Sequence, residues 1–226
     1  MGIPSIGVQL ITAESFASVV AQWREPLEAY ARLLVEKNQV LNLISRRQED
    51  QVLSWHIFHC VAAGVFLPFA DGEEILDVGT GGGLPGIPLA IMFPKCRFTL
   101  LDSIGKKIYA VAEFVEKLGL RNVSTFQSRV ESLPPRKNFD VITGRSVAAL
   151  PQFLKWTWPR LRKPSNLPAK DQETDLPPQG VIYIGGGALT SNWRMLGLPQ
   201  PRIFSLASHC HISNGEGKWV AYFQKT

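Results

Sequence analysis

Short apolar runs alternate with longer amphipathic segments from about residue 71 onward. Apolar runs of about five residues are typical of strands buried on both faces of a sheet, whereas apolar residues spaced by three or four positions indicate helices. The strands predicted in this way are Glu74–Val78, Arg97–Leu101, Val123–Gln127, Phe139–Thr143 and Val181–Ile184, and the helices are Ile87–Phe93, Ile108–Leu118 and Leu150–Leu161. Strands that alternate with helices predict an α/β fold with a mostly parallel sheet.

The end of the chain follows a different pattern. Arg202–Ala207 and Trp219–Phe223 read as a final antiparallel pair of strands. The stretch 163–180 is polar, rich in proline and without an apolar pattern, so we expect a flexible loop there. We find no internal repeat and predict that residues 71–226 form one globular unit.

Residues 1–70 read as a helical extension that packs on this α/β core. Apolar residues recur at helical spacing over Thr12–Asn38, and Pro26 is expected to divide that helix in two. A further helix is predicted over Glu49–Phe66.

The first predicted strand leads into a segment dense in glycine. Gly79 to Gly86 holds five glycines and a proline, and begins two residues after Asp77. Glycine permits sharp turns and lets a ligand approach the backbone closely. The next strand ends in Asp102. A strand, glycine loop, helix, strand and acid in this order predict a site for a nucleoside.

Two cofactors compete for this loop. Residues 81–86 spell G-x-G-x-x-G, with Asp102 about twenty residues on, as in a dinucleotide site. However, Asp77-x-Gly79-x-Gly81 comes first, and an acid at that place repels phosphate but suits an ammonium group. S-adenosylmethionine carries an ammonium group and ribose hydroxyls but no phosphate. The loop therefore favours a methyltransferase over a dehydrogenase.

Charged residues follow several of the predicted strands. Because ligands bind at the carboxyl ends of strands in an open parallel sheet, these residues are expected at one rim. They are Asp77, Asp102, Arg129, Glu131 and Arg145. In the alternative interpretation, Arg129 and Glu131 merely pair on the surface. Lys106 and Lys107 open a helix, where cations oppose the helix dipole, so they are either contacts for an anion or a solvated face.

Composition adds limits to this picture. There are 24 Lys and Arg residues against 19 acids, and the net charge of +5 permits RNA as a partner without demonstrating it. The three cysteines show no C-x-x-C spacing. His56 with Cys60, and His209 with His211, are too few ligands for a metal, so we expect none and interpret His56 as a hydrogen-bonded helix residue. The N-terminus lacks a signal-peptide pattern and no run is long enough to cross a membrane, so we expect a soluble cytoplasmic protein.

Five segments together resemble the RsmG (GidB) methyltransferases. They read NLISRR, LDVGTGGGLPGIPLA, FTLLDSIGKK, QSRVE and FDVITGRSVAAL, and the resemblance covers about residues 35 to 163. It implies a Rossmann-like class I methyltransferase with a helical extension, which uses S-adenosylmethionine to methylate N7 of a guanine in small-subunit (16S) ribosomal RNA. It also implies a monomer with no membrane or DNA partner.

The resemblance implies roles for individual residues. Gly79, Leu84, Val130, Glu131 and Arg145 would contact the cofactor, together with Asp77, Gly81 and the ribose acid Asp102. Lys106 and Arg129 would contact RNA, and Arg129 and Arg145 would act at the catalytic centre.

The C-terminal third departs from the pattern of the family. Gly185–Gly187 stands where relatives carry a lysine, and Gly217-Lys218 stands where they carry an arginine. Two alternatives therefore stay open: a non-catalytic protein that binds RNA or the ribosome, and a methyltransferase with another acceptor.

Overall fold

The computed structural model describes residues 18, 20–45, 52–135, 137–163, 179–187, 193, 197, 199–207 and 217–225. Four regions treated in the sequence analysis lie outside the described residues: the start of the first predicted helix, residues 46–51 with the start of the second predicted helix, most of the loop at 163–180, and His209 to His211. None of the described helices is long and apolar enough to cross a membrane.

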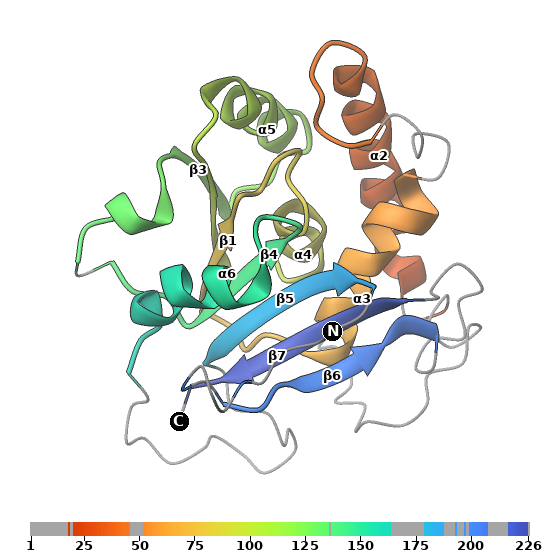
Figure 1. Cartoon of the computed structure of the whole chain (residues 1–226). Helices are drawn as coiled ribbons and strands as arrows, with labels where there is room; N and C mark the ends of the chain where they lie inside the picture. Colours follow the sequence, from red (N-terminus) through yellow and green to blue (C-terminus); the bar gives the residue numbers. More distant parts are fainter. Residues whose placement is uncertain are drawn as a thin grey trace.

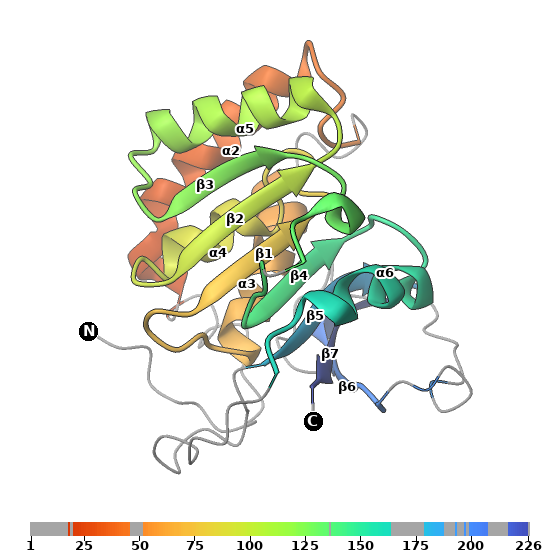
Figure 2. The same ribbon diagram turned by 90° about the vertical axis from the view of Figure 1, so that its left-hand side faces the viewer.

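Seven strands form one sheet in the order β3-β2-β1-β4-β5-β7-β6 (Figure 2). The first five are parallel, and β7 runs antiparallel to both β5 and β6. The strands are β1 Glu74–Val78, β2 Arg97–Asp102, β3 Val123–Gln127, β4 Val141–Arg145, β5 Gly180–Gly186, β6 Arg202–Ser205 and β7 Lys218–Gln224. The predicted α/β fold is confirmed, including the antiparallel pair at the end.

Helices cover both faces of the sheet (Figures 1 and 2). The helices are α2 Arg24–Asn38, α3 Phe58–Phe66, α4 Gly86–Met92, α5 Gly105–Lys117 and α6 Leu150–Thr157, with short turns η1 Ala21–Trp23, η3 Val52–Ile57, η4 Val130–Ser132 and η5 Trp158–Arg160. Residues of α2 to α5 share one apolar cluster with Ile75 and Leu100, and residues of α6 share the other with Leu76 and Ile142. Because side chains alternate along a strand, β1, β2, β4, β5 and β7 each contribute to both clusters.

Several element boundaries differ from the prediction, among them those of β4 and α6. Strand β4 begins at Val141 and continues through Arg145, because Gly144 and Arg145 pair with Tyr183 and Ile184 of β5. The α-helix α6 ends at Thr157, and η5 follows it.

The first described helix is continuous through Pro26. The turn η1 runs directly into α2, and Pro26 lies in the first turn of α2, where its missing N–H costs little. In the second helix, η3 is a π-helix that continues into α3.

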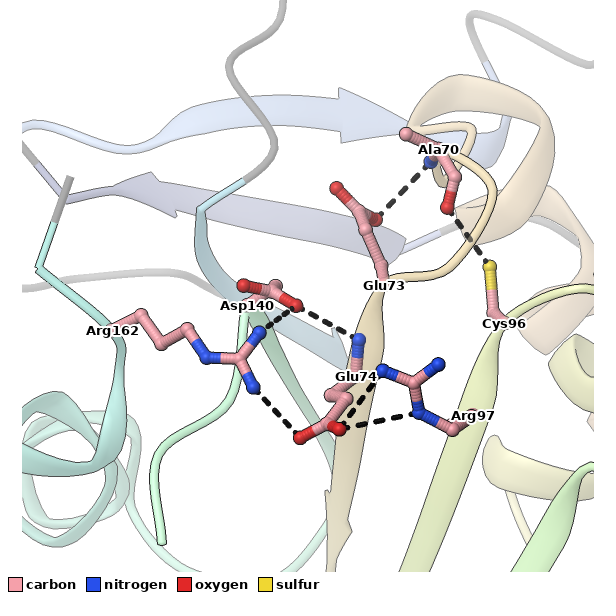
Figure 3. A network of polar contacts seen from close by, with 7 residues as sticks. All are labelled: Ala70, Glu73, Glu74, Cys96, Arg97, Asp140 and Arg162. Carbon is pink, nitrogen blue, oxygen red and sulfur yellow. Dashed lines mark hydrogen bonds and ion pairs between the residues drawn. The ribbon is translucent and has the colours of Figure 1, made fainter. Parts of the chain in front are cut away.

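Ion pairs link the amino ends of the central parallel strands, at the opposite end of these strands from the glycine loop (Figure 3). Glu74 accepts hydrogen bonds from Arg97 at 3.0 Å and from Arg162 at 2.8 Å. Arg162 also donates to Asp140 at 2.6 Å, and Asp140 accepts the backbone N–H of Glu74 at 2.9 Å. This network joins the first residues of β1 and β2 to Asp140, which precedes β4, and to Arg162, which follows η5.

Beside that network, Glu73 is buried without a charged partner among the described residues. Its Oε2 accepts the N–H of Ala70 at 3.2 Å, but its Oε1 has no partner within the described part of the chain. Burial raises the pKa of Glu73 to about 8; Ala70 opposes the rise and the charge of Asp140 adds to it.

We expect Glu73→Gln to remove a loss in the free energy of unfolding that the wild type shows as pH rises. The pKa of Glu73 rises from 4.5 in the unfolded chain to about 8 in the folded protein, so folding takes up a proton between these values. The stabilising contribution is therefore complete below pH 4.5 and falls as pH rises toward 8, by up to about 1.4 kcal/mol per pH unit. Thermal unfolding at pH 5, 7 and 8.5 should show the variant gaining on the wild type as pH rises.

Glu116→Gln on the exposed side of α5 is the matched control, and its difference from wild type should not change in this way. A constant difference between Glu73→Gln and wild type at all three pH values would contradict the raised pKa.

Candidate functional site

The glycine loop lies between β1 and α4, at the carboxyl ends of the parallel strands. Gly79 and Gly81 have positive φ values of 67° and 60°, a backbone region that other residues rarely adopt. A Cβ added to Gly79 would lie 2.7 Å from Val147, whereas one added to Gly81 would have no neighbour closer than 3.9 Å among the described residues. Gly81 is therefore a position where a ligand can approach the loop backbone.

Other glycines of the loop are required by packing. A Cβ added to Gly82 would lie 2.7 Å from Leu34 of α2, and one added to Gly86 would lie 2.1 Å from Leu100 of β2. Tyr30 of α2 also donates its hydroxyl to the carbonyl of Gly82 at 2.8 Å. The helical extension thus packs directly on the loop.

Asp77 is fully buried beneath the loop. Its Oδ2 accepts the N–H of Gly86 at 3.1 Å, and its Oδ1 accepts the hydroxyl of Thr143 at 3.2 Å. Burial raises the pKa of Asp77 to about 6, while hydrogen bonds from the Thr80 hydroxyl, Gly86 and Thr143 act in the opposite direction. The carboxylate joins β1, the first turn of α4 and β4.

The contact between Asp77 and Gly86 bears on the choice of cofactor. In a dinucleotide site the pyrophosphate binds at the N-terminus of the helix that follows the glycine loop. Here a buried carboxylate already accepts the N–H of Gly86, at the first residue of α4. A pyrophosphate at this point would meet that carboxylate, so the geometry disfavours a dinucleotide.

Asp102 connects the loop to the end of β2. Its Oδ2 accepts the N–H of Gly81 at 3.0 Å and its Oδ1 accepts the N–H of Ile104 at 2.9 Å. Its side chain lies at the rim of the sheet beside Gly81, the open position of the loop. Asp102 thus has both a structural role and a place at the predicted site.

Arg145 ends β4 and turns toward the helical extension. Asp77 of β1 lies opposite Thr143 of β4, and Arg145 is two residues further along β4. Because alternate side chains of a strand point to the same face, all three side chains lie on the face of the sheet that α3 covers. The guanidinium of Arg145 donates to the carbonyl of His56 at 2.9 Å and contacts the Nδ1 of the same residue. It also lies 3.5 Å from the Sγ of Cys60.

Two titratable groups that contact Arg145, His56 and Cys60, are held uncharged. Burial, followed by the charges of Arg145 and Lys218, lowers the pKa of His56 to about 3. Burial raises the pKa of the Cys60 thiol to about 11. The described residues contain no group of His, Cys, Asp and Glu that could hold a metal, and His56 is hydrogen-bonded within a helix, as its sequence context predicts.

The remaining predicted residues surround the same rim. Arg129 and Glu131 are exposed after β3, Val130 is buried between them, Leu84 is buried in the loop, and Lys106 is exposed in the first turn of α5. Arg129 and Glu131, both described, form no ion pair with each other. The alternative that they simply pair on the surface therefore has no support.

The two departures in the C-terminal third are neighbours. Gly186 of β5 pairs with Lys218 of β7, and a Cβ added to Gly186 would lie 3.2 Å from the Nζ of Lys218. The ammonium of Lys218 therefore lies over the end of β5, close enough to Arg145 for that charge to lower its pKa, after the larger effect of burial. The sequence identified Lys218 as a departure from the family but not its place near Arg145. It also missed the contacts of Tyr30, Thr143 and Val147, because each of these contacts joins segments far apart in the chain.

Comparison with known proteins agrees with this architecture. The family described as rRNA small subunit methyltransferase G matches residues 24–169. A ribosomal RNA small subunit methyltransferase G from Christiangramia forsetii is 38% identical over 195 residues, covering 86% of this chain and 87% of the relative. One from Chlorobium limicola is 46% identical over 156 residues, covering 69% of this chain and 70% of the relative.

Solved structures support the fold alone. A SAM-dependent methyltransferase from Aquifex aeolicus aligns with a TM-score of 0.52 at 20% identity, over 74% of this chain and 89% of that one. A mutant of MtNAS in complex with S-adenosylmethionine aligns with a TM-score of 0.55 at 16% identity, over 96% of this chain and 85% of that one. The family match and the two relatives establish that this chain belongs to the rRNA small subunit methyltransferase G family.

Proposed function

We propose that this protein transfers a methyl group from S-adenosylmethionine to N7 of a guanine in small-subunit (16S) ribosomal RNA. The observation that carries the proposal is a glycine loop whose helix-end amide is already bonded to a buried carboxylate, in a chain of the rRNA small subunit methyltransferase G family. An enzyme with this substrate acts in the cytoplasm. We expect a monomer that binds neither DNA nor membranes.

The chemistry of the loop fits S-adenosylmethionine. The backbone is open at Gly81, where an added Cβ would lie 3.9 Å from its nearest neighbours among the described residues, so a ligand can reach it. Asp102 uses one lone pair on each oxygen for the backbone and keeps others for ribose hydroxyls. When bound, S-adenosylmethionine supplies a methyl group on a positively charged sulfur, which suits a site with two carboxylates at the loop.

Residue roles follow from the rim and from family membership. We assign cofactor contacts to Asp77, Gly79, Gly81, Leu84, Asp102, Val130, Glu131 and Arg145, and RNA contacts to Lys106 and Arg129. Asp77 acts from beneath the loop, because both of its oxygens accept hydrogen bonds from the protein. Arg129 and Arg145 are the cations nearest in sequence to the ends of β3 and β4, and we assign them to the catalytic centre.

Methylation at N7 needs alignment and no proton transfer. Guanine N7 is a neutral lone pair, so the residues of the site have only to hold it in line with the methyl group, an effect worth up to about 7–11 kcal/mol. The usual bidentate arginine contact with guanine uses both O6 and N7. Since N7 must stay free for the reaction, Arg129 can hold only O6 or a phosphate.

The direct test is methylation of small ribosomal subunits that lack 7-methylguanine in their RNA. Purified protein with S-adenosylmethionine should restore one 7-methylguanine, detected by mass spectrometry of the RNA. Binding to the subunit without turnover would support the non-catalytic alternative. Methylation only of a protein or small molecule would support the alternative acceptor.

Asp102→Asn should weaken binding of S-adenosylmethionine about tenfold or more. The change removes a charge and one acceptor at the rim, and a hydrogen bond to a charged group contributes about 1.5–3 kcal/mol. Calorimetric titration measures this loss directly.

Asp71→Asn is the control, because Asp71 lies in an exposed turn before β1 and, among the described residues, pairs with Lys95 alone. Its affinity for the cofactor should equal that of wild type. Equal affinity of Asp102→Asn and wild type, with both folded, would remove Asp102 from the site.

Lys106→Ala should weaken RNA binding and leave cofactor binding unchanged. Each lost phosphate contact lowers the slope of log K against log salt by about 0.7–0.9. Titration of small-subunit RNA at several salt concentrations gives this slope.

Lys117→Ala, at the opposite end of α5, is the matched control. An equal change of slope in both variants would mean that the effect comes from net charge and not from a contact at the rim.

A further inference from the structure

The guanidinium of Arg145 is held by uncharged groups of the helical extension. Its hydrogen bonds go to the carbonyl of His56 at 2.9 Å, to the Nδ1 of His56 and to the Sγ of Cys60 at 3.5 Å. Within the described part of the chain, Arg145 forms no ion pair with a carboxylate. These contacts therefore orient the side chain without neutralising its charge.

His56 is suited to this task because its ring is a fixed acceptor. A guanidinium has only donors, so the Nδ1 of His56 must carry a lone pair and the ring proton must be on Nε2. The ring is only 5% exposed, and its pKa of about 3 keeps it neutral at physiological pH. The Nε2 has no partner among the described residues, so the Nδ1 contact is the polar contact that fixes the ring.

The backbone of the same residue adds to the arrangement. His56 belongs to the π-helix η3, and its carbonyl accepts both from Arg145 and from the thiol of Cys60 at 3.1 Å. The ring and the backbone carbonyl of His56 thus contact the same guanidinium, that of Arg145. The last residue of β4 is attached in this way to a segment some ninety residues earlier in the chain.

We infer that His56 is a positioning residue, which orients Arg145 at the carboxyl end of β4 and so makes the helical extension part of the cofactor site. The inference rests on the proposed function, because there Arg145 contacts S-adenosylmethionine. In the competing interpretation His56 only fills space in the core, and any side chain of similar volume would serve.

The atom that His56 offers to Arg145 separates these interpretations. In His56→Asn the amide oxygen takes the place of Nδ1, so an acceptor remains for the guanidinium. In His56→Gln the amide lies near the place of Nε2, and in His56→Leu there is no acceptor. We expect the affinity for S-adenosylmethionine to stay within about threefold of wild type in His56→Asn and to fall about tenfold or more in the other two.

Rescue by asparagine is the decisive readout, measured by calorimetry together with KM for S-adenosylmethionine and kcat. His59→Gln is the matched control, because His59 is 4% exposed on the next helical turn and its Nε2 contacts the carbonyl of Trp219 at 3.3 Å. It should bind the cofactor as wild type does. If His56→Leu does not fold, the comparison of asparagine with glutamine still decides, because both are polar amides.

A double-mutant cycle with Arg145→Ala distinguishes failure of the inference from failure of the proposed function. If His56 acts through Arg145, His56→Leu should have no further effect on cofactor affinity in the Arg145→Ala background. Unchanged affinity in Arg145→Ala alone would refute the assignment of Arg145 to the cofactor. A loss in Arg145→Ala with equal affinities in His56→Asn and His56→Gln would refute the positioning role.

Discussion

Two carboxylates hold the glycine loop, and the geometry of the site depends on them. Asp77 binds the start of α4 and the hydroxyl of Thr143 from below, while Asp102 binds Gly81 and Ile104 from the next strand. Each is the acid at or near the end of a buried strand, so the sheet fixes its position. The backbone N–H groups of Gly81 and Gly86 are satisfied by these acids.

The helical extension contributes to the same site from the other side. Tyr30 and Leu34 of α2 pack on Gly82, and His56 holds Arg145. Asn38, at the end of α2, is buried and accepts the N–H groups of Leu43 and Ile44, which fixes the turn beside the loop. The extension therefore packs against the site, since its polar contacts reach the glycine loop at Gly82 and the end of β4 at Arg145.

The arginines at the two ends of the parallel strands have different partners. At the amino ends, shown in Figure 3, ion pairs that serve stability join Glu74, Asp140, Arg97 and Arg162. At the carboxyl ends of the strands, Arg145 is bonded to neutral groups, and burial, followed by the charge of Arg145, lowers the pKa of His59 to about 3. A cation held by neutral groups keeps its attraction for anions, whereas the charges of the arginines paired with carboxylates are largely offset.

The sequence alone determined the order of the elements, the parallel sheet and the loop, because hydrophobic spacing and glycine placement are local signals. It also identified Asp77, Asp102 and Arg145 as strand-end charges, since the carboxyl ends of parallel strands lie at one edge. Tertiary structure decided what those side chains do: Asp77 is buried as a brace, and several glycines are needed for packing against Leu34 and Leu100. The contact of Arg145 with His56 could not be predicted, because it depends on how η3 and α3 pack against β4, and no local pattern encodes a contact between side chains so far apart in the chain.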